Sequence, residues 1–396
     1  MPKRILTLFS ALLLILITAA PLSAQMYRTV HERAVVADTH NDVLLRAMTG
    51  EDLSVATTNG HSDLVRLKQG GVDVQFFSVW CGDEYGHGRA YRRANAMIDT
   101  LGALIARSGG RAHLVRNARE LDGALAKGRL AALIGVEGGH MIEDDPSKLD
   151  SLAARGMRYL TLTWNNSTTW ATSAADEEEK GDSLPFQGLT DLGREIVKRM
   201  NRLGVMVDLS HTGERTFWDV LAVTTKPVLV SHSSVYSICP NRRNLKDEQI
   251  KAVAKNGGVI CVNFYAGFID SAYEGRVREI RRGNRALVDS VRRSTGDRWR
   301  AETVIDSLLA PAYESIRPPL SLLIDHIEYI AKMAGVDHVG LGSDFDGIES
   351  LPKEMDDVTF LPNIARELLK RGYTDGEVAK ILGGNVVRVF RANAPI

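Results

Sequence analysis

Cysteine is scarce in this chain. Only Cys81, Cys239 and Cys261 occur among 396 residues, and no two of them have a Cys-x-x-Cys spacing. This scarcity argues against a zinc site built from thiolates. Because each cysteine lies in an apolar or strand-like context, we expect buried free thiols, although an oxidising compartment would also allow one disulfide.

An excess of charge of one sign is also absent. Lysine plus arginine number 49 and aspartate plus glutamate number 49, so the formal net charge is zero. A balanced chain gives no reason to expect nucleic acid or an anionic membrane as a partner.

Long apolar runs are missing after the first 24 residues. Residues 1–24 begin with Lys3 and Arg4, continue with an apolar stretch at 5–20 and end in small residues before Gln25. This order is typical of a secretory signal peptide, and the apolar stretch is short for a membrane span. We therefore expect an exported chain, periplasmic or secreted, with no transmembrane span in the mature protein. A retained N-terminal anchor is the alternative.

Several common catalytic signatures are missing too. The chain has no Gly-x-Ser-x-Gly elbow, Walker loop or dinucleotide fingerprint between a predicted strand and a helix. Its cysteines lie in no nucleophile motif. The chemistry must therefore depend on other residues.

The sequence does contain a repeated alternation of short apolar runs and longer segments of helical period. The runs lie at 34–39, 72–80, 131–136, 159–164, 205–210, 228–231, 258–264 and 338–343. Continuous hydrophobicity predicts strands covered on both faces, as in a parallel sheet. Eight such strands alternating with helices predict an α/β fold, a single (β/α)8 barrel of TIM type, over residues 25–396.

One segment, 266–319, interrupts this alternation before the last strand. Residues 276–300 alone hold nine arginines, interspersed with acids. The pattern predicts a helical insertion packed outside the barrel with a solvated face. Aromatic residues are not interleaved, so a nucleic-acid surface is not favoured, whereas a substrate-access lid or a subunit contact remains an alternative.

Metal-capable side chains follow five of the eight predicted strands. They are His40 and Asp42 after the first strand, Glu137 after the third, His211 after the fifth, His232 after the sixth and Asp344 after the eighth. The carboxyl ends of barrel strands meet at one face, so we expect these side chains to be neighbours. Each alone is more often a hydrogen-bonded core or surface residue. Their shared placement favours a metal site, because imidazole nitrogen and carboxylate oxygen both suit zinc.

The order of these residues is compatible with two metal ions. His40 and Asp42 would hold one ion, His211 and His232 the other, and Glu137 could bridge them through its two oxygens. Two ions roughly 3.5–4 Å apart can share a bound hydroxide and polarise a carbonyl group.

Seven motifs, taken together, resemble the membrane (renal-type) dipeptidase family. They are Asp38-Thr39-His40-Asn41-Asp42, Glu137-Gly138-Gly139-His140, Tyr159-Leu160-Thr161-Leu162-Thr163, Val207-Asp208-Leu209-Ser210-His211, Ser231-His232-Ser233-Ser234, Arg242-Arg243-Asn244 and Gly342-Ser343-Asp344-Phe345-Asp346-Gly347. The similarity runs from about residue 35 to about residue 390 and is interrupted by the arginine-rich segment.

The resemblance implies a zinc-dependent dipeptidase, a hydrolase of the metallopeptidase class, which is often a homodimer. Two Zn²⁺ ions per chain would be expected on the barrel. His40 and Asp42 would bind the first, His211 and His232 the second, and Glu137 would bridge them. A bridging hydroxide activated by the two ions would attack the peptide bond of the dipeptide.

The resemblance also assigns residues to the substrate. Arg243 matches the arginine that holds the substrate carboxylate, and Asp344 matches the acid that passes a proton to the leaving amine. Where well-studied relatives have a substrate-contacting histidine, this chain has Trp164, which cannot accept a proton. Asn165 or Asn166 could take over the contact with the substrate.

Two other functions remain open at this stage. One is an amidase or lactonase of the wider amidohydrolase group, acting on another small substrate. The other is a non-catalytic barrel that binds a partner through the arginine-rich segment.

Overall fold

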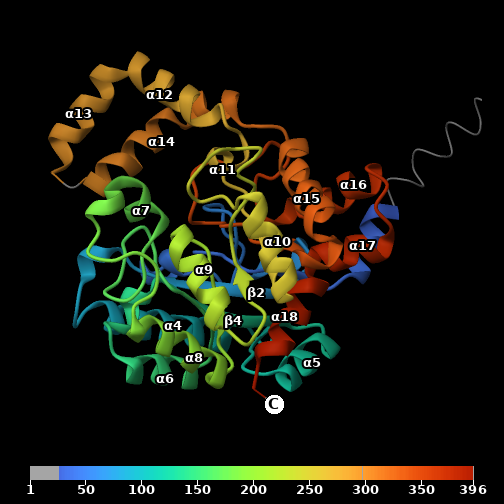
Figure 1. The fold of residues 1–396 in the computed structure, drawn as a ribbon. Helices are drawn as coiled ribbons and strands as arrows, with labels where there is room; N and C mark the ends of the chain where they lie inside the picture. The colour runs from blue at the N-terminus through green and yellow to red at the C-terminus, as the bar shows by residue number, and fades with distance from the viewer. Residues whose placement is uncertain (1–25, 297, 396) are drawn as a thin grey trace, which may run out of the picture.

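The structure is a computed structural model that describes residues 26–296 and 298–395 (Figure 1). The predicted signal peptide at 1–24 lies outside the described residues. Within those residues, no helix is both long enough and apolar enough to cross a bilayer.

Eight parallel strands form a closed ring. In ring order they are β1 (Val36–Asp38), β2 (Val72–Trp80), β4 (Leu130–Glu137), β5 (Met157–Thr161), β6 (Met206–Asp208), β7 (Leu229–Val230), β8 (Val259–Val262) and β9 (Val339–Leu341). Strand β2 pairs with β4, and β9 pairs with β1, which closes the ring. The predicted (β/α)8 barrel is confirmed.

A short ninth strand, β3 (Ala112–Leu114), lies outside the ring and was not predicted. It pairs with residues 130–132 of β4, before β5 takes over that side of β4 at Ile134. Because β3 has only three residues and its central His113 is exposed, no apolar run marks it.

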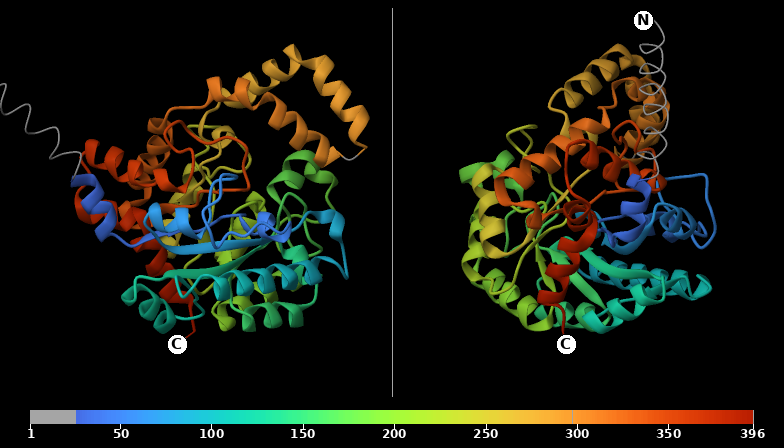
Figure 2. Two further views of the ribbon diagram at one scale, coloured as in Figure 1. Left: turned by 180° about the vertical axis from the view of Figure 1, so that it is seen from behind. Right: turned by 90° about the vertical axis from the view of Figure 1, so that its right-hand side faces the viewer.

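Helices surround the ring, as the two views of Figure 2 show. They are α2 (Leu44–Met48), α3 (Leu64–Gln69), α4 (Ala90–Arg107), α5 (Ala118–Ala126), α6 (Pro146–Ala154), α7 (Ala174–Lys180), α8 (Asp191–Leu203), α9 (Glu214–Val223), α10 (Asp247–Asn256), α15 (Leu320–Ala334), α16 (Pro362–Lys370), α17 (Asp375–Ala379) and α18 (Asn385–Asn393). Local sequence sets their ends. Helix α8 begins where the Thr190 side chain accepts a hydrogen bond from the Gly193 N–H, and it ends at Gly204, whose φ of 71° suits glycine.

The last helices are joined without a loop. A reciprocal capping box between Thr374 and Glu377 starts α17. The chain then passes through a kinked turn, Lys380–Gly384, directly into α18. A Cβ atom on Gly383 would lie 2.3 Å from the Val35 carbonyl oxygen, so glycine is required where this turn meets β1.

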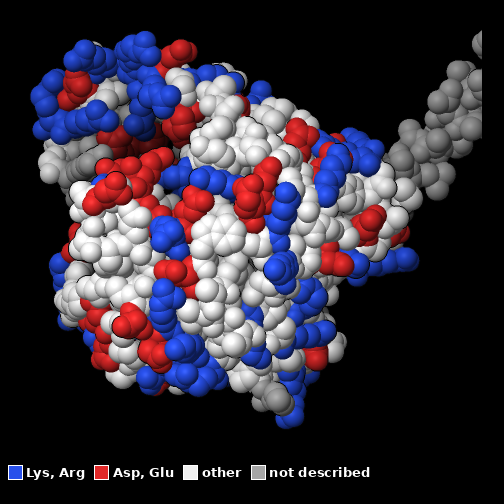
Figure 3. All heavy atoms as spheres, in the orientation of Figure 1, with Lys and Arg blue, Asp and Glu red and all other residues white. Residues whose placement is uncertain are grey.

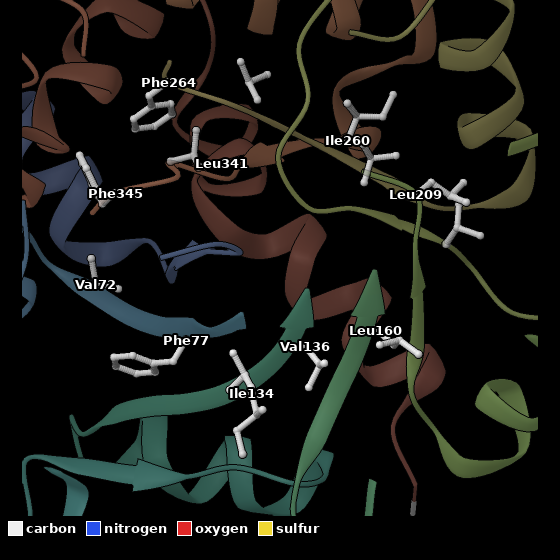
Figure 4. Close-up of a cluster of buried hydrophobic side chains, with 14 of the residues drawn as sticks. Val72, Phe77, Ile134, Val136, Leu160, Leu209, Ile260, Phe264, Leu341 and Phe345 are labelled. Carbon is white, nitrogen blue, oxygen red and sulfur yellow. The ribbon is translucent and has the colours of Figure 1, made fainter. Parts of the chain in front are cut away.

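The core has two layers because each strand is covered on both faces. Side chains such as Phe76 and Leu133 point into the ring, where α18 contributes Val386 and Phe390. The alternate side chains, among them Phe77 and Ile134, pack outward under the helices (Figure 4). This alternation explains why the strands read as continuous apolar runs.

The predicted insertion is helical and precedes the last strand. It consists of α11 (Ala266–Ile269), α12 (Tyr273–Gly283), α13 (Arg285–Thr295) and α14 (Arg298–Ile316), and α12 to α14 project from the barrel as an arm (Figures 1 and 2). The arm has a small core around Val288, Ile305 and Leu309. Its outer surface is rich in arginine (Figure 3).

The three cysteines are free and buried, as predicted. Burial raises the pKa of the Cys81 thiol to about 12 and that of Cys239 to about 11. These thiols therefore stay protonated at neutral pH and are poor nucleophiles.

Candidate metal centre and substrate pocket

The loops after β1 and β9 are held together at the carboxyl face of the barrel. The Asp38 carboxylate accepts hydrogen bonds from the Ser343 N–H at 2.8 Å and the Ser343 hydroxyl at 2.7 Å. The Asp344 N–H donates to the His40 carbonyl at 3.1 Å. These bonds place Asp42 and Asp344 side by side, and a Cβ atom on Gly347 would lie 2.2 Å from Asp42 Oδ2.

Glu137 is the centre of the cluster. Its Oε2 atom lies 3.5 Å from His40 Nε2, while its Oε1 atom lies 2.9 Å from His211 Nε2 and 3.4 Å from His232 Nε2. Asp42 Oδ2 lies 3.3 Å from His40 Nε2. The two oxygens of one carboxylate thus face different histidines, Oε2 toward His40 and Oε1 toward His211 and His232.

The donor atoms fit metal ions. One ligand atom each from His40, Glu137 and His232 lies within 4.8 Å of the others, and the same holds for His40, Asp42 and Asp344. Among the described residues, His40 Nε2 and Asp42 Oδ1 are buried and have no hydrogen-bond partner. Buried polar atoms without partners are costly, and nitrogen and oxygen donors of this kind suit zinc. A cation would satisfy both atoms.

The three histidines are oriented alike, with Nε2 toward Glu137 and Nδ1 toward a supporting group. His40 Nδ1 lies 2.8 Å from the Tyr159 hydroxyl, and His211 Nδ1 lies 3.2 Å from Asn165 Oδ1. Such partners fix the ring orientation of metal-binding histidines. The role of Tyr159 was not predicted, because nothing in the sequence pairs it with a histidine 119 positions away.

His232 is supported by a relay. Its Nδ1 lies 2.7 Å from Ser231 Oγ, and that hydroxyl donates to Asp208 Oδ2 at 2.6 Å. Asp208 also accepts from the Thr161 hydroxyl at 2.6 Å and the Ser231 N–H at 2.8 Å. The one sign of this role in the sequence is that Asp208 is a charged residue within the apolar run of β6.

We expect Asp208→Asn to weaken metal binding at the cluster by about 10- to 100-fold, because the amide cannot accept all of these hydrogen bonds. Competition with a chromophoric chelator would measure the affinity. The surface variant Asp150→Asn, which loses only a pair with Arg199, is the control. Equal metal affinity in the Asp208 variant and the control would show that Asp208 does not support His232.

The environment sets the charge of the cluster. Burial alone would raise the pKa of Glu137, but the contacts with His40, His211 and His232 hold it well below its usual range. Burial raises the pKa of Asp344 to about 7, against the lowering effect of His40. Burial also lowers the pKa of His211 to about 4. The imidazole of His211 is therefore neutral at physiological pH, as a metal ligand must be.

Two of these residues have strained backbones. His211 and Asp344 have φ angles of 64° and 63°, in the left-handed region. Such conformations cost roughly 1–3 kcal/mol and are concentrated at functional sites. Asp344 is further held by Asn263, whose Nδ2 donates to its Oδ2 at 2.8 Å.

A cavity of about 570 Å³ opens over the cluster. Its lining includes Asp42, Leu45, Trp80, Glu137, Trp164, Asn165, Glu178, His211, His232, Arg242, Arg243, Tyr265, Phe268, Asp344, Ile348 and Glu349. Its volume is in the range of pockets that hold small ligands. Four of the five predicted ligands, all except His40, line this cavity together with Arg243, Trp164 and Asn165.

Arg243 is buried in the wall of this cavity. Its guanidinium lies 5.2 Å from the centre of the Phe268 ring, and Nη2 donates to the His232 carbonyl at 3.5 Å. Nε and Nη1 have no hydrogen-bond partner in the part of the chain that is described. Burial lowers the pKa of Arg243 to about 10, but the side chain still carries a charge at neutral pH.

The three residues Trp164, Asn165 and Asn166, which follow β5, make different contacts. Trp164 lines the cavity, and its ring centre lies 6.4 Å from that of His211. Asn165 also reaches the cavity, yet its Oδ1 faces His211, so it supports a histidine as well. Asn166 is not among the lining residues, and its amide contacts the Ser167 carbonyl at 3.4 Å.

A (β/α)8 barrel with histidines and carboxylates gathered at its strand ends is an arrangement typical of metal-dependent hydrolases. The sequence profile described as "Membrane dipeptidase (Peptidase family M19)" matches residues 24–395. The chain therefore belongs to the membrane dipeptidase family, peptidase family M19, and is a metallo-dipeptidase.

Individual relatives agree. An uncharacterized dipeptidase of Schizosaccharomyces pombe is 34% identical over 389 residues, covering 93% of this chain and 83% of the relative. The solved structure of the M19 metallopeptidase called dipeptidase AC has a TM-score of 0.73 at 26% identity, covering 91% of this chain and 99% of the other. The probable dipeptidase PvdM of Pseudomonas aeruginosa shares the fold, with a TM-score of 0.78 at 24% identity over 94% of this chain and 98% of the other.

Proposed function

We propose that this chain is an exported dipeptidase that uses two zinc ions per chain and binds the free carboxylate of its substrate through Arg243. One observation carries the proposal. The carboxylate of Glu137, shared between two histidine groups, lines the same cavity as buried Arg243, whose Nε and Nη1 have no hydrogen-bond partner among the described residues.

The metal ligands follow from the two sides of Glu137. His40 and Asp42 would hold one ion, His211 and His232 the other, and Glu137 would touch both. When bound, the ions would supply Lewis acidity for the scissile carbonyl and would lower the pKa of water.

The protein's own groups would position the dipeptide. The Arg243 guanidinium can donate two parallel hydrogen bonds to a carboxylate, which fixes the distance between that carboxylate and the peptide bond. Asp344, held by Asn263 and 3.9 Å from His40 Nε2 through Oδ1, can pass a proton to the leaving amine. A substrate must then carry a free carboxylate one residue from the bond that breaks.

The proposed function includes export through a signal peptide and assembly as a homodimer. The order of charged, apolar and small residues in 1–24 supports a signal peptide. Homodimer formation is supported by the resemblance to the family. N-terminal sequencing of the exported protein and light scattering of the purified chain test these two points.

A dipeptide panel tests the proposed activity. Ala-Ala with an L- or D-residue at the C-terminus is apt, because a metallopeptidase of Rhodobacter sphaeroides was solved with a phosphinate mimic of the dipeptide L-Ala-D-Ala. That structure is 24% identical, with a TM-score of 0.73, and covers 91% of this chain and 99% of the other. We expect the zinc-loaded protein to cleave dipeptides but not tri-alanine. If it leaves every dipeptide intact, the proposed function is wrong.

A further inference from the structure

Two tryptophans form one wall of the cavity. Trp80 is the last residue of β2 and Trp164 follows β5, and their rings meet edge to face with centres 5.0 Å apart. Both rings line the cavity. The Trp164 ring lies close to His211, so this wall borders the cluster itself.

This wall lies across the barrel from Arg243. In ring order, β2 and β5 flank β4, whereas Arg243 follows β7 and the Phe268 ring beneath it follows β8. In a ring of eight strands, β4 and β8 are diametrically opposite. Glu137, at the end of β4, contacts histidines from β1, β6 and β7 between these two sides.

The direction of a bound dipeptide follows from this layout and rests on the proposed function. With its carboxylate at Arg243 and its peptide bond at the histidine cluster, the chain of the substrate runs away from β7 and β8. Its N-terminal residue then lies on the side of β2 and β5. The side chain of that residue meets the two tryptophans.

We propose that Trp80 and Trp164 form the subsite for the N-terminal side chain, and that the enzyme prefers dipeptides with a large apolar, above all aromatic, N-terminal residue. Leu45 and Ile348, which follow β1 and β9, extend the apolar lining on the neighbouring strands. For an aromatic side chain, removal from water and edge-to-face contact with the two rings both make the free energy of binding more favourable. For an alanine side chain, both contributions are small.

The test compares substrates that differ only in one side chain. In the zinc-loaded enzyme, we expect kcat/KM for Phe-Ala to exceed that for Ala-Ala by about 10-fold or more. Trp164→Ala and Trp80→Ala should each lower this ratio to about 3-fold or less. Trp164→Leu keeps a large apolar side chain to protect folding and should reduce the preference for Phe-Ala over Leu-Ala. The ratio of kcat/KM for Ala-Phe to kcat/KM for Ala-Ala should be the same in these variants as in the wild type.

The control is Trp218→Ala, which removes an exposed tryptophan on α9 outside the cavity. Zinc content is measured for every variant, because Trp164 lies beside a ligand. Hydrolysis of Phe-Ala and Ala-Ala at equal rates, or a preference that survives all three substitutions, would overturn the inference while leaving the proposed function intact. Failure to cleave any dipeptide would overturn the proposed function and this inference together.

Discussion

Replacing Glu137 with glutamine should lower dipeptide hydrolysis by about 1,000-fold or more and reduce the zinc content of the purified protein. Both carboxylate oxygens face histidine groups, at 3.5 Å and 2.9 Å. Glutamine offers one oxygen and turns an NH₂ group toward the other site. Loss of a supporting partner alone costs about 10- to 100-fold, so loss of a shared ligand should cost more. Elemental analysis and kcat/KM for Ala-Ala would measure both effects.

The control for this variant is Glu195→Gln. Glu195 is an exposed residue of α8 that pairs with Lys198 at 2.7 Å, and its loss should leave zinc content and activity as they were. A Glu137→Gln protein with two zinc ions and wild-type kcat/KM would show that this carboxylate does not bridge the site.

Replacing Arg243 should slow the hydrolysis of substrates that have a free carboxylate, without slowing the hydrolysis of substrates that lack one. For Arg243→Met, we expect kcat/KM on dipeptides to fall by about 100- to 1,000-fold, because losing one partner of a buried charged pair costs about 2–5 kcal/mol. Arg243→Lys should recover little, since an ammonium group cannot donate the same parallel pair of hydrogen bonds. Dipeptide amides should be cleaved slowly by the wild type and no more slowly by either variant.

This result distinguishes the two enzymatic functions that the sequence left open. If Arg243→Met lowers kcat/KM equally for dipeptides and their amides, the arginine does not recognise a carboxylate. An amidase acting on another small substrate would then fit better. Arg199→Met, which removes a surface pair with Asp150 on α6, is the control.

The barrel and most of the candidate site could be predicted from the sequence because both depend on the ends of strands. A strand covered on both faces must be continuously apolar, so a polar residue at its carboxyl end, such as His40 or Glu137, stands out. Once the strands form a closed ring, these ends must meet. The contacts around Glu137 are therefore largely a consequence of topology.

Features that depend on pairs of distant side chains could not be predicted. The hydroxyl of Tyr159 supports His40, and the ring of Trp80 packs against Trp164, but no local pattern links either pair. Strand β3 was missed because it is short and half-exposed. In each case the deciding information is the register of one strand against another, which periodicity does not contain.

In the proposed function, two zinc ions held around Glu137 would make the barrel a dipeptidase. The most direct measurement is a zinc titration of the chelator-treated protein, with Ala-Ala hydrolysis followed at each addition. We expect little activity without metal and a rise that levels off at two zinc equivalents per chain. Full activity in the metal-free protein, or a plateau at one equivalent, would contradict the proposed function.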